Sequence, residues 1–245
     1  MKTLRLLALL SAVLAASCAH TAKVRGVQEA TTSYLSGGKK IVVETYLPAS
    51  PGRHPAVAVL YGSGGLINGK GDMVAFARLL AQRGMAAYLI HYFDRTGTLI
   101  AGDKSIAADS KIWQATVKDG IDFISQQPEV NPRAIGLYGY SLGAFLSVGA
   151  ATTDARIVAA AELSGGLFQG LKGHTRRFPP MLILHGSDDQ RVRIKFAEEL
   201  LLEARRMHAR PAVHIYPGEG HSLSTSAAAD ATTRALIFLQ LHLHP

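Results

Sequence analysis

Residues 135–146 read Ile-Gly-Leu-Tyr-Gly-Tyr-Ser-Leu-Gly-Ala-Phe-Leu, with the serine at position 141. The apolar run before the serine is typical of a buried strand, and the run after it of a helix, so Ser141 falls on a sharp strand-to-helix turn. Such a turn strains the serine backbone, and Gly139 and Gly143 leave the room that it needs. We predict a nucleophile elbow with Ser141 as nucleophile. The alternative is a glycine-lined turn in which a small polar side chain only packs.

A serine hydroxyl is a poor nucleophile and needs a base that a carboxylate orients. A second predicted strand, residues 181–185, runs into a loop that contains Asp188 and Asp189. A third, residues 212–216, runs into a glycine-rich loop that ends at His221. The carboxyl ends of parallel strands meet at one edge of a sheet, so these side chains and Ser141 are expected to lie together.

The rest of the chain alternates between strand-like and helix-like stretches, which predicts the α/β class with a mostly parallel central sheet and helices on both faces. Asp72 is the predicted N-cap of the first helix. The loops 92–101 and 166–179 are short, so we expect little or no lid. Strands are predicted over 41–47, 56–61, 85–91, 134–138, 157–163, 181–185 and 212–216. Helices are predicted over 72–83, 142–151, 194–207 and 222–241, and a further long helix follows the loop 92–101 and ends near residue 127.

These motifs resemble the dienelactone hydrolase-like family of the α/β-hydrolase superfamily, over roughly residues 40–243. The superfamily's acid loop commonly reads Gly-x-x-Asp-x-x-Val, which through Gly186 and Val192 implies Asp189 as the acid, with Asp188 as the alternative. The run Tyr-Pro-Gly-Glu-Gly-His, residues 216–221, is similar to the family's histidine loop and implies His221 as the base. The founding enzymes use cysteine where this chain has Ser141. That departure points toward general ester hydrolysis.

The expected oxyanion donors are two backbone N–H groups. One is the N–H of Leu142, directly after the nucleophile. The second comes from the loop after residues 56–61, where many relatives carry His-Gly-x-Gly-Gly and this chain has Tyr-Gly-Ser-Gly-Gly, residues 61–65. Ser63 is the candidate donor. Tyr61 is a candidate substrate-binding residue that orients this loop or presents its hydroxyl, and the alternative is a strand-end aromatic that only packs.

Arg95 is a second candidate for substrate binding, because it follows a predicted strand at the same edge and can hold a carboxylate with two hydrogen bonds. The alternative pairs Arg95 with Asp94 or Asp103. Surface or packing roles are expected for four further histidines, which are His174, His185, His208 and His214.

The first residues have the form of a secretory signal. Lys2 and Arg5 precede the apolar run 6–16, which ends in small residues before Cys18, the only cysteine. This resembles a bacterial lipoprotein signal, which implies cleavage after residue 17 and a lipidated Cys18 attached to a membrane in the cell envelope. The alternative is cleavage after residue 19 and a soluble exported protein. Residues 18–38 are predicted to be a tether, and residues 39–245 the hydrolase domain.

The composition fits one globular domain, with 48% apolar and 18% charged residues. The net charge of +8 is dispersed, and no basic run alternates with aromatic residues, so a nucleic-acid partner is not expected. No residue spacing suggests a metal ligand set or a phosphate-binding loop, so no metal and no cofactor are expected.

The predicted function is therefore cleavage of a small or medium carboxylic ester or lactone through an acyl-enzyme on Ser141. Two alternatives remain open. The first is a peptidase or acyltransferase that uses the same three residues. The second is a non-catalytic envelope lipoprotein that reuses the fold.

Overall fold

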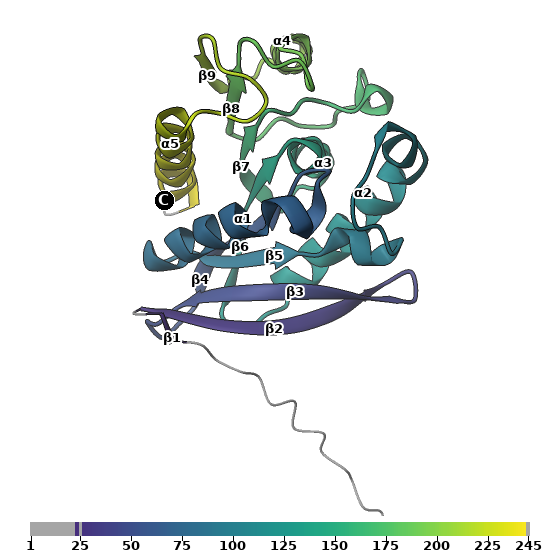
Figure 1. Cartoon of the computed structure of the whole chain (residues 1–245). Coiled ribbons are helices and arrows are strands. Elements are labelled where there is room, and N and C mark those ends of the chain that lie inside the picture. The colour runs from purple at the N-terminus through teal and green to yellow at the C-terminus, as the bar shows by residue number, and fades with distance from the viewer. Residues whose placement is uncertain (1–22, 25, 244–245) are drawn as a thin grey trace, which may run out of the picture.

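The computed structural model describes residues 23–24 and 26–243, which form one sheet covered by helices (Figure 1). In this part of the chain the sheet has nine strands in the order β1-β2-β3-β5-β4-β6-β7-β8-β9. The strands β1, β2, β3 and β5 pair antiparallel, and all pairs from β5 to β9 are parallel. The strands are β1 (Lys23–Val24), β2 (Val27–Ser36), β3 (Lys39–Pro48), β4 (His54–Leu60), β5 (Ala86–Ile90), β6 (Val130–Tyr140), β7 (Ile157–Leu163), β8 (Met181–Gly186) and β9 (Ala212–Tyr216).

Helices cover both faces of the sheet. The helices α1 and α5 contact each other on one face, and α2 and α3 contact each other on the opposite face (Figure 1). Central strands such as β4 are apolar at nearly every position because both of their faces are covered, and its residues 56–60 have no exposed surface. The predicted α/β class is confirmed. The helices are α1 (Gly65–Gln82), η1 (Tyr92–Arg95), α2 (Asp103–Ser125), α3 (Leu142–Thr153), η2 (Gln169–Leu171), α4 (Lys195–Arg206) and α5 (Thr225–Leu243).

The tether predicted over residues 18–38 is wrong where the structure describes a regular strand. Residues 27–36 form β2, which pairs with β3 along its whole length. In β2 the buried Tyr34 and Ser36 share one face, and Val27 is buried at the start of the opposite face. The exposed side chains are Gln28, Thr31, Thr32 and Leu35. A strand with few buried positions and several Thr and Ser residues resembles a polar segment in the sequence, which explains the error. The predicted signal and Cys18 lie outside the described residues.

The first helix begins seven residues earlier than predicted. Helix α1 starts at Gly65, so Asp72 lies inside it and is not its N-cap. Residues 65–71 contain three glycines, which disfavour a helix by propensity and hid its first two turns. The packing of α1 against β5 and β3 overrides that preference.

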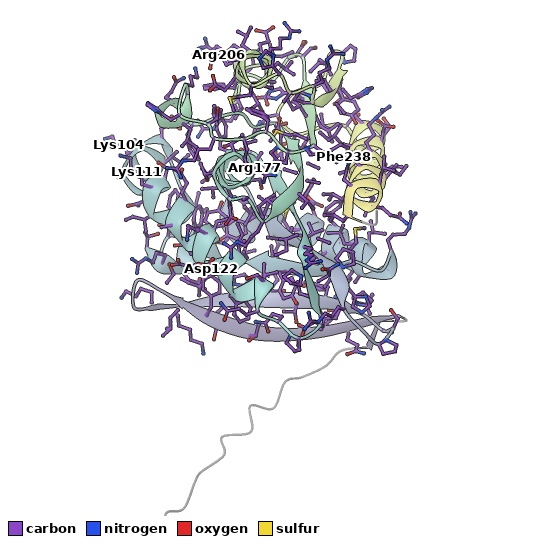
Figure 2. All side chains as sticks on the ribbon, turned by 180° about the vertical axis from the view of Figure 1, so that it is seen from behind. Lys104, Lys111, Asp122, Arg177, Arg206 and Phe238 are labelled. Carbon is purple, nitrogen blue, oxygen red and sulfur yellow. The ribbon has the colours of Figure 1, made fainter. Side chains whose placement is uncertain are left out.

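Apart from Glu162, Asp189 and Glu203, the charged side chains of the described residues are at least partly exposed. Lys104 and Lys111 extend outward from α2, and Arg206 from α4, on well-separated parts of the molecule (Figure 2). Among the described helices, none combines the length and apolar character that crossing a membrane requires.

Candidate active site

The strand-to-helix turn holds Ser141 in a rare backbone conformation. Strand β6 ends at Tyr140 and α3 begins at Leu142, and Ser141 between them has φ 53° and ψ −118°. Backbone contacts hold this strained residue, because its N–H donates to Leu163 O at 2.9 Å and its C=O accepts from Ala144 N at 2.9 Å. The nucleophile elbow predicted from the sequence therefore has the expected geometry.

The two flanking glycines have no room for a side chain. A Cβ atom on Gly139 would lie 2.2 Å from Gly143 O. A Cβ atom on Gly143 would lie 2.2 Å from Leu60 O and 2.4 Å from Tyr61 O. These neighbours are backbone atoms of the elbow and of the end of β4, so they cannot move aside as a flexible side chain can.

A Gly143→Ala substitution is expected to lower the free energy of unfolding by about 3 kcal/mol, because the new methyl group collides with backbone atoms. Gly71→Ala is the matched control. Gly71 lies inside α1 with open space around it, so alanine there is expected to raise stability by about 0.5–1 kcal/mol. Urea unfolding followed by circular dichroism measures both changes. Equal effects at the two positions would contradict the crowding at the elbow.

Ser141, His221 and Asp189 form a continuous hydrogen-bonded chain. His221 Nε2 lies 2.9 Å from Ser141 Oγ, and His221 Nδ1 lies 2.7 Å from Asp189 Oδ2. An ionised carboxylate only accepts hydrogen bonds, so Nδ1 carries the proton and Nε2 is free to accept the serine proton. The structure brings these three predicted residues together, although they lie up to 80 positions apart in the chain.

The acid loop selects Asp189 rather than Asp188. Asp189 is 3% exposed, and its Oδ1 accepts from the backbone N–H groups of Arg191 and Val192, each at 2.8 Å. Its other oxygen thereby faces His221. Asp188 is exposed, and its Oδ1 accepts from Ser187 Oγ at 2.7 Å. Of the two aspartates, only Asp189 contacts the imidazole.

Neighbouring residues fix the histidine loop. The Tyr140 hydroxyl donates to His221 O at 3.2 Å, and the two rings pack with centroids 5.3 Å apart. Gly186 at the end of β8 permits the loop to cross, because a Cβ atom there would lie 2.3 Å from Glu219 O. The imidazole is therefore held from two sides.

The two predicted oxyanion donors lie beside the nucleophile. The Leu142 N–H is the first of α3 and has no acceptor within the helix. The turn that carries Ser63 is fixed by a Gly65 N–H bond to Gly62 O at 3.0 Å and by an Ala101 N–H bond to Ser63 O at 2.8 Å. Ser63, Ser141 and Leu142 line one pocket. This arrangement supports both backbone groups as candidate donors.

Tyr61 does not offer its hydroxyl to a substrate, which corrects one of the two possibilities considered for it. The side chain is 1% exposed, and its hydroxyl accepts from Phe93 N at 3.0 Å. Its ring stacks on Tyr92 with centroids 4.4 Å apart, and the Tyr92 hydroxyl donates to Tyr61 O at 2.7 Å. Tyr61 supports the loop that presents Ser63.

Arg95 lies away from the pocket, so its prediction as a substrate-binding residue is wrong. Its Nη1 donates to Ser36 O at 2.6 Å and to Gly37 O, where β2 turns into β3. The predicted alternatives are wrong as well. Asp94 Oδ2 accepts from Val42 N at 2.9 Å, and Asp103 pairs with Arg191 at 2.7 Å.

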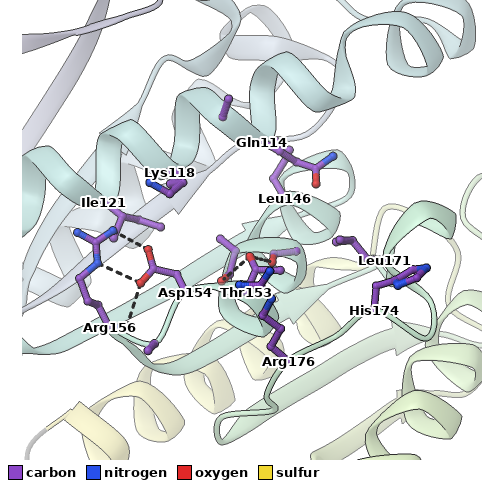
Figure 3. Close-up of a pocket in the computed structure, with 14 residues that line it drawn as sticks. Gln114, Lys118, Ile121, Leu146, Thr153, Asp154, Arg156, Leu171, His174 and Arg176 are labelled. Carbon is purple, nitrogen blue, oxygen red and sulfur yellow. Dashed lines mark hydrogen bonds and ion pairs between the residues drawn. The ribbon is translucent and has the colours of Figure 1, made fainter.

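The pocket at Ser141 has a volume of about 310 Å³ and contains residues that the sequence did not single out. The segment 166–179, predicted as one of two short loops, supplies part of its wall. A larger hollow of about 670 Å³ lies between α2 and α3, with Lys118, Leu146 and His174 around it, and it contains none of the three residues of the hydrogen-bonded chain (Figure 3). The further side chains in the smaller pocket are Asp103, Ile106, Phe145, Leu167, Phe168, Gln169, Arg191, Val192 and Phe196.

His185 is a buried residue that contacts the acid loop. The side chain has no exposed surface, and its Nε2 lies 2.7 Å from Val192 O and 3.5 Å from Asp189 Oδ2. Burial lowers the pKa of this imidazole, so the neutral form donates from Nε2 to the carbonyl. The packing role expected for His185 therefore includes holding the end of the loop that carries Asp189.

Glu162 is a buried carboxyl group on β7, in the strand next to the elbow. It has no exposed surface, and its Oε2 accepts from Gly165 N at 2.8 Å. Within the described residues its Oε1 has no partner. Burial raises the pKa of Glu162 to about 8, so the group is protonated at neutral pH.

The Glu162→Gln variant is expected to be more stable than the wild type by on the order of 3 kcal/mol at pH 7, because glutamine imitates the protonated acid. Between pH 4.5 and about 8, the folded wild type keeps a proton on Glu162 that the unfolded chain has lost. Stability therefore falls as pH rises through this window, with a slope of at most about 1.4 kcal/mol per pH unit. Urea unfolding at pH 5, 6.5 and 8 checks this. Parallel curves for the two proteins would show that Glu162 does not titrate there.

A metal centre has no obvious place in this part of the chain. The described residues contain no group of three or more His, Cys, Asp or Glu side chains arranged to hold an ion.

Residues 42–237, about four fifths of the chain, match the dienelactone hydrolase family. The chain belongs to this family. Its members are hydrolases, so the chain is a hydrolase of the ester or lactone type. The resemblance identified from the elbow, the acid loop and the histidine loop is confirmed.

Solved structures of the same fold agree with this membership. One is a dienelactone hydrolase-like promiscuous phosphotriesterase from metagenomic libraries, with 20% identity, a TM-score of 0.76 and coverage of 89% of this chain and 99% of that one. A cold-adapted esterase from an Arctic intertidal metagenomic library has 20% identity, a TM-score of 0.72 and coverage of 91% and 97%. A dienelactone hydrolase from Anabaena variabilis has 19% identity, a TM-score of 0.69 and coverage of 89% and 100%. No curated protein matches the chain. At these identities the likeness establishes the α/β-hydrolase fold.

Proposed function

We propose that the protein is a serine hydrolase that cleaves small to medium carboxylic esters or lactones through an acyl-enzyme on Ser141. The observation that carries this proposal is the chain of contacts from Ser141 Oγ to His221, at 2.9 Å, and from His221 to Asp189, at 2.7 Å. A nucleophile, a base and an orienting acid within hydrogen-bond distance are what acyl transfer by a serine requires. The esterase among the similar structures supports an ester as substrate.

The first half of the reaction forms the acyl-enzyme. Ser141 Oγ attacks the ester carbonyl carbon while its proton passes to His221 Nε2. The carbonyl oxygen becomes an oxyanion, which the N–H groups of Leu142 and Ser63 stabilise. The bond from carbon to the alcohol oxygen then breaks, and His221 Nε2–H protonates that oxygen as the alcohol leaves. Asp189 stabilises the imidazolium throughout.

The second half releases the acid. Water gives a proton to His221 Nε2 and attacks the acyl carbon. The tetrahedral intermediate collapses by breaking its bond to Ser141 Oγ, which takes the proton back from His221. The same groups therefore serve twice, and the enzyme returns to its starting state.

Covalent labelling tests this proposal directly. A fluorophosphonate probe reacts with activated serines, and peptide mass spectrometry is expected to place its adduct on Ser141. Ser164→Ala is the matched control. Ser164 also has a positive φ, 57°, and is buried, but within the described residues its Oγ has no hydrogen-bond partner. We expect this variant to retain labelling.

A substrate panel separates the proposal from its alternatives. Nitrophenyl esters are expected to be cleaved, and peptide amides to be cleaved far more slowly or not at all. Cleavage of amides alone would replace the esterase proposal with a peptidase. Absence of an adduct on Ser141 in the wild type would favour a non-catalytic envelope protein.

We also propose that the mature protein is exported to the bacterial cell envelope and anchored there through a lipid on Cys18. Support comes from the basic start, the apolar run 6–16 and the position of the only cysteine. The mass of the mature N-terminal peptide tests this. A plain N-terminus at His20 would indicate the soluble exported form.

A further inference from the structure

The pocket at Ser141 lies on the acyl side of the proposed reaction. In the tetrahedral intermediate the reacting carbon holds Ser141 Oγ, the oxyanion, the acyl substituent and the leaving oxygen. The leaving oxygen must face His221 Nε2, which protonates it. The 310 Å³ pocket contains Ser141 and both proposed oxyanion donors, Ser63 and Leu142, but not His221. The acyl substituent is therefore the part of the substrate that enters it.

Three phenylalanines form the wall of this pocket. Phe145 lies one turn after Ser141 on α3, Phe168 follows β7, and Phe196 lies in the first turn of α4. The ring centroid of Phe145 lies 5.3 Å from that of Phe168 and 5.6 Å from that of Phe196. The rings of Phe145 and Phe196 meet edge to face, with an angle of 79° between their planes. These residues come from three separate elements.

The three rings are only partly buried, although phenylalanine usually avoids water. A cluster of apolar side chains open to a hollow indicates a binding surface. Leu167 and Val192 close the pocket behind the rings, with exposed fractions of 1% and 9%. The wall therefore offers apolar contacts and the edges and faces of aromatic rings.

An ion pair stands at the solvent-exposed side of the pocket. Arg191 Nη2 lies 2.7 Å from Asp103 Oδ1, and their side chains are 47% and 82% exposed. The pair joins the acid loop to the start of α2. Among the described residues that line the pocket, Arg191 is the one cation, and an anionic acyl group would have to compete with Asp103 for it. Its volume lies near the lower limit of small-molecule pockets, which run from about 300 to 1,000 Å³.

We infer that this pocket makes the enzyme selective for esters whose acyl group is compact, uncharged and aromatic, of about the size of phenylacetyl. This inference rests on the proposed function. Acetyl leaves the rings in contact with water, a long alkyl chain exceeds the pocket, and a carboxylate-bearing acyl group must compete with Asp103 for Arg191. Aromatic acyl groups gain additional edge-to-face contacts that a saturated ring of the same size lacks.

A series of p-nitrophenyl esters tests the inference with one leaving group throughout. The acyl groups are acetyl, decanoyl, phenylacetyl, cyclohexylacetyl and hemisuccinyl. We expect kcat/KM for phenylacetyl to exceed that for acetyl by about 10- to 100-fold and that for cyclohexylacetyl by about threefold. Decanoyl and hemisuccinyl esters are expected to react more slowly than the phenylacetyl ester.

Variants of Phe196 locate the selectivity. Phe196→Ala is expected to lower the ratio of phenylacetyl to acetyl turnover about tenfold, because the alanine removes an aromatic contact that only the larger acyl group makes. Phe196→Trp fills the pocket and lowers the same ratio, which provides a second test if the alanine variant is unstable. The matched control is Phe238→Ala. Phe238 is also partly buried but lies on α5, on the opposite side of the molecule from Lys104 at the start of α2 (Figure 2).

Three outcomes would overturn the inference. They are an acetyl or hemisuccinyl ester that equals or exceeds phenylacetyl, a Phe238 variant that shifts the ratio as much as a Phe196 variant, and Phe196 variants that change all esters equally. Fluorophosphonate labelling separates this failure from failure of the proposed function. A labelled Ser141 with a flat acyl profile rejects the pocket alone, whereas an unlabelled Ser141 rejects both.

Discussion

Ser141→Ala is expected to lower kcat for nitrophenyl ester hydrolysis by at least about 10⁴-fold. The hydroxyl is the group that forms the acyl-enzyme, and the methyl group of alanine cannot replace it. The variant is expected to fold, because the elbow is held by backbone bonds from Ser141 N and to Ser141 O, which alanine retains. Steady-state kinetics, with a single-turnover measurement to exclude trace wild-type enzyme, gives the loss.

The control for this prediction is Ser164→Ala. Ser164 shares the positive φ and the burial of Ser141 but has no base beside it in the described part of the chain. Its replacement is expected to change kcat less than about threefold. A Ser141→Ala variant with more than about one hundredth of the wild-type rate would show that another nucleophile or an activated water performs the reaction.

The elbow and the histidine loop were predictable because each signal is local. Gly139, Ser141 and Gly143 lie within five residues, and the reason for both glycines is a collision within the elbow and with the end of β4. His221 ends a glycine-rich loop directly after a strand. The order of the segments along the chain then determined which edge of the sheet they share, since parallel strands align their carboxyl ends.

The errors concern contacts that only the tertiary structure determines. Arg95 follows a strand at the expected edge, but its side chain turns back to Ser36 O and Gly37 O in a hairpin that the sequence did not reveal. That hairpin was hidden because few side chains of β2 are buried, so the strand lacks a clear alternation of apolar and polar residues. Because β2 was not predicted, the carbonyl groups at its end were not considered as partners of Arg95.

The acyl pocket could not be predicted for a related reason. Phe145, Phe168 and Phe196 lie on three elements, and each looks like an ordinary core residue in its own segment. Only their partial exposure around one hollow distinguishes them. One local signal did exist, because Phe145 lies four residues after Ser141 in the sequence. Residues four apart in a helix share a face, so Phe145 was expected on the same side as the nucleophile.

Asp189→Asn is expected to lower kcat by on the order of 10⁴-fold while leaving the fold intact. The structure gives the reason. Oδ1 of Asp189 accepts from the N–H groups of Arg191 and Val192, so the amide oxygen of asparagine must stay there. Its NH₂ group then faces His221 Nδ1, which can only accept. The imidazole proton moves to Nε2, and the base that Ser141 requires is lost.

Asp188→Asn is the matched control, because the same change occurs one residue away. Asp188 is exposed and bonds to Ser187 Oγ, so its replacement is expected to alter kcat less than about threefold. Circular dichroism and urea unfolding check that both variants fold. If Asp188→Asn were the more damaging of the two, the acid loop would have to rearrange in the working enzyme. If both were harmless, His221 would act without a carboxylate. With the expected result, the loss follows from the orientation of one amide group, since charge is removed equally at both positions.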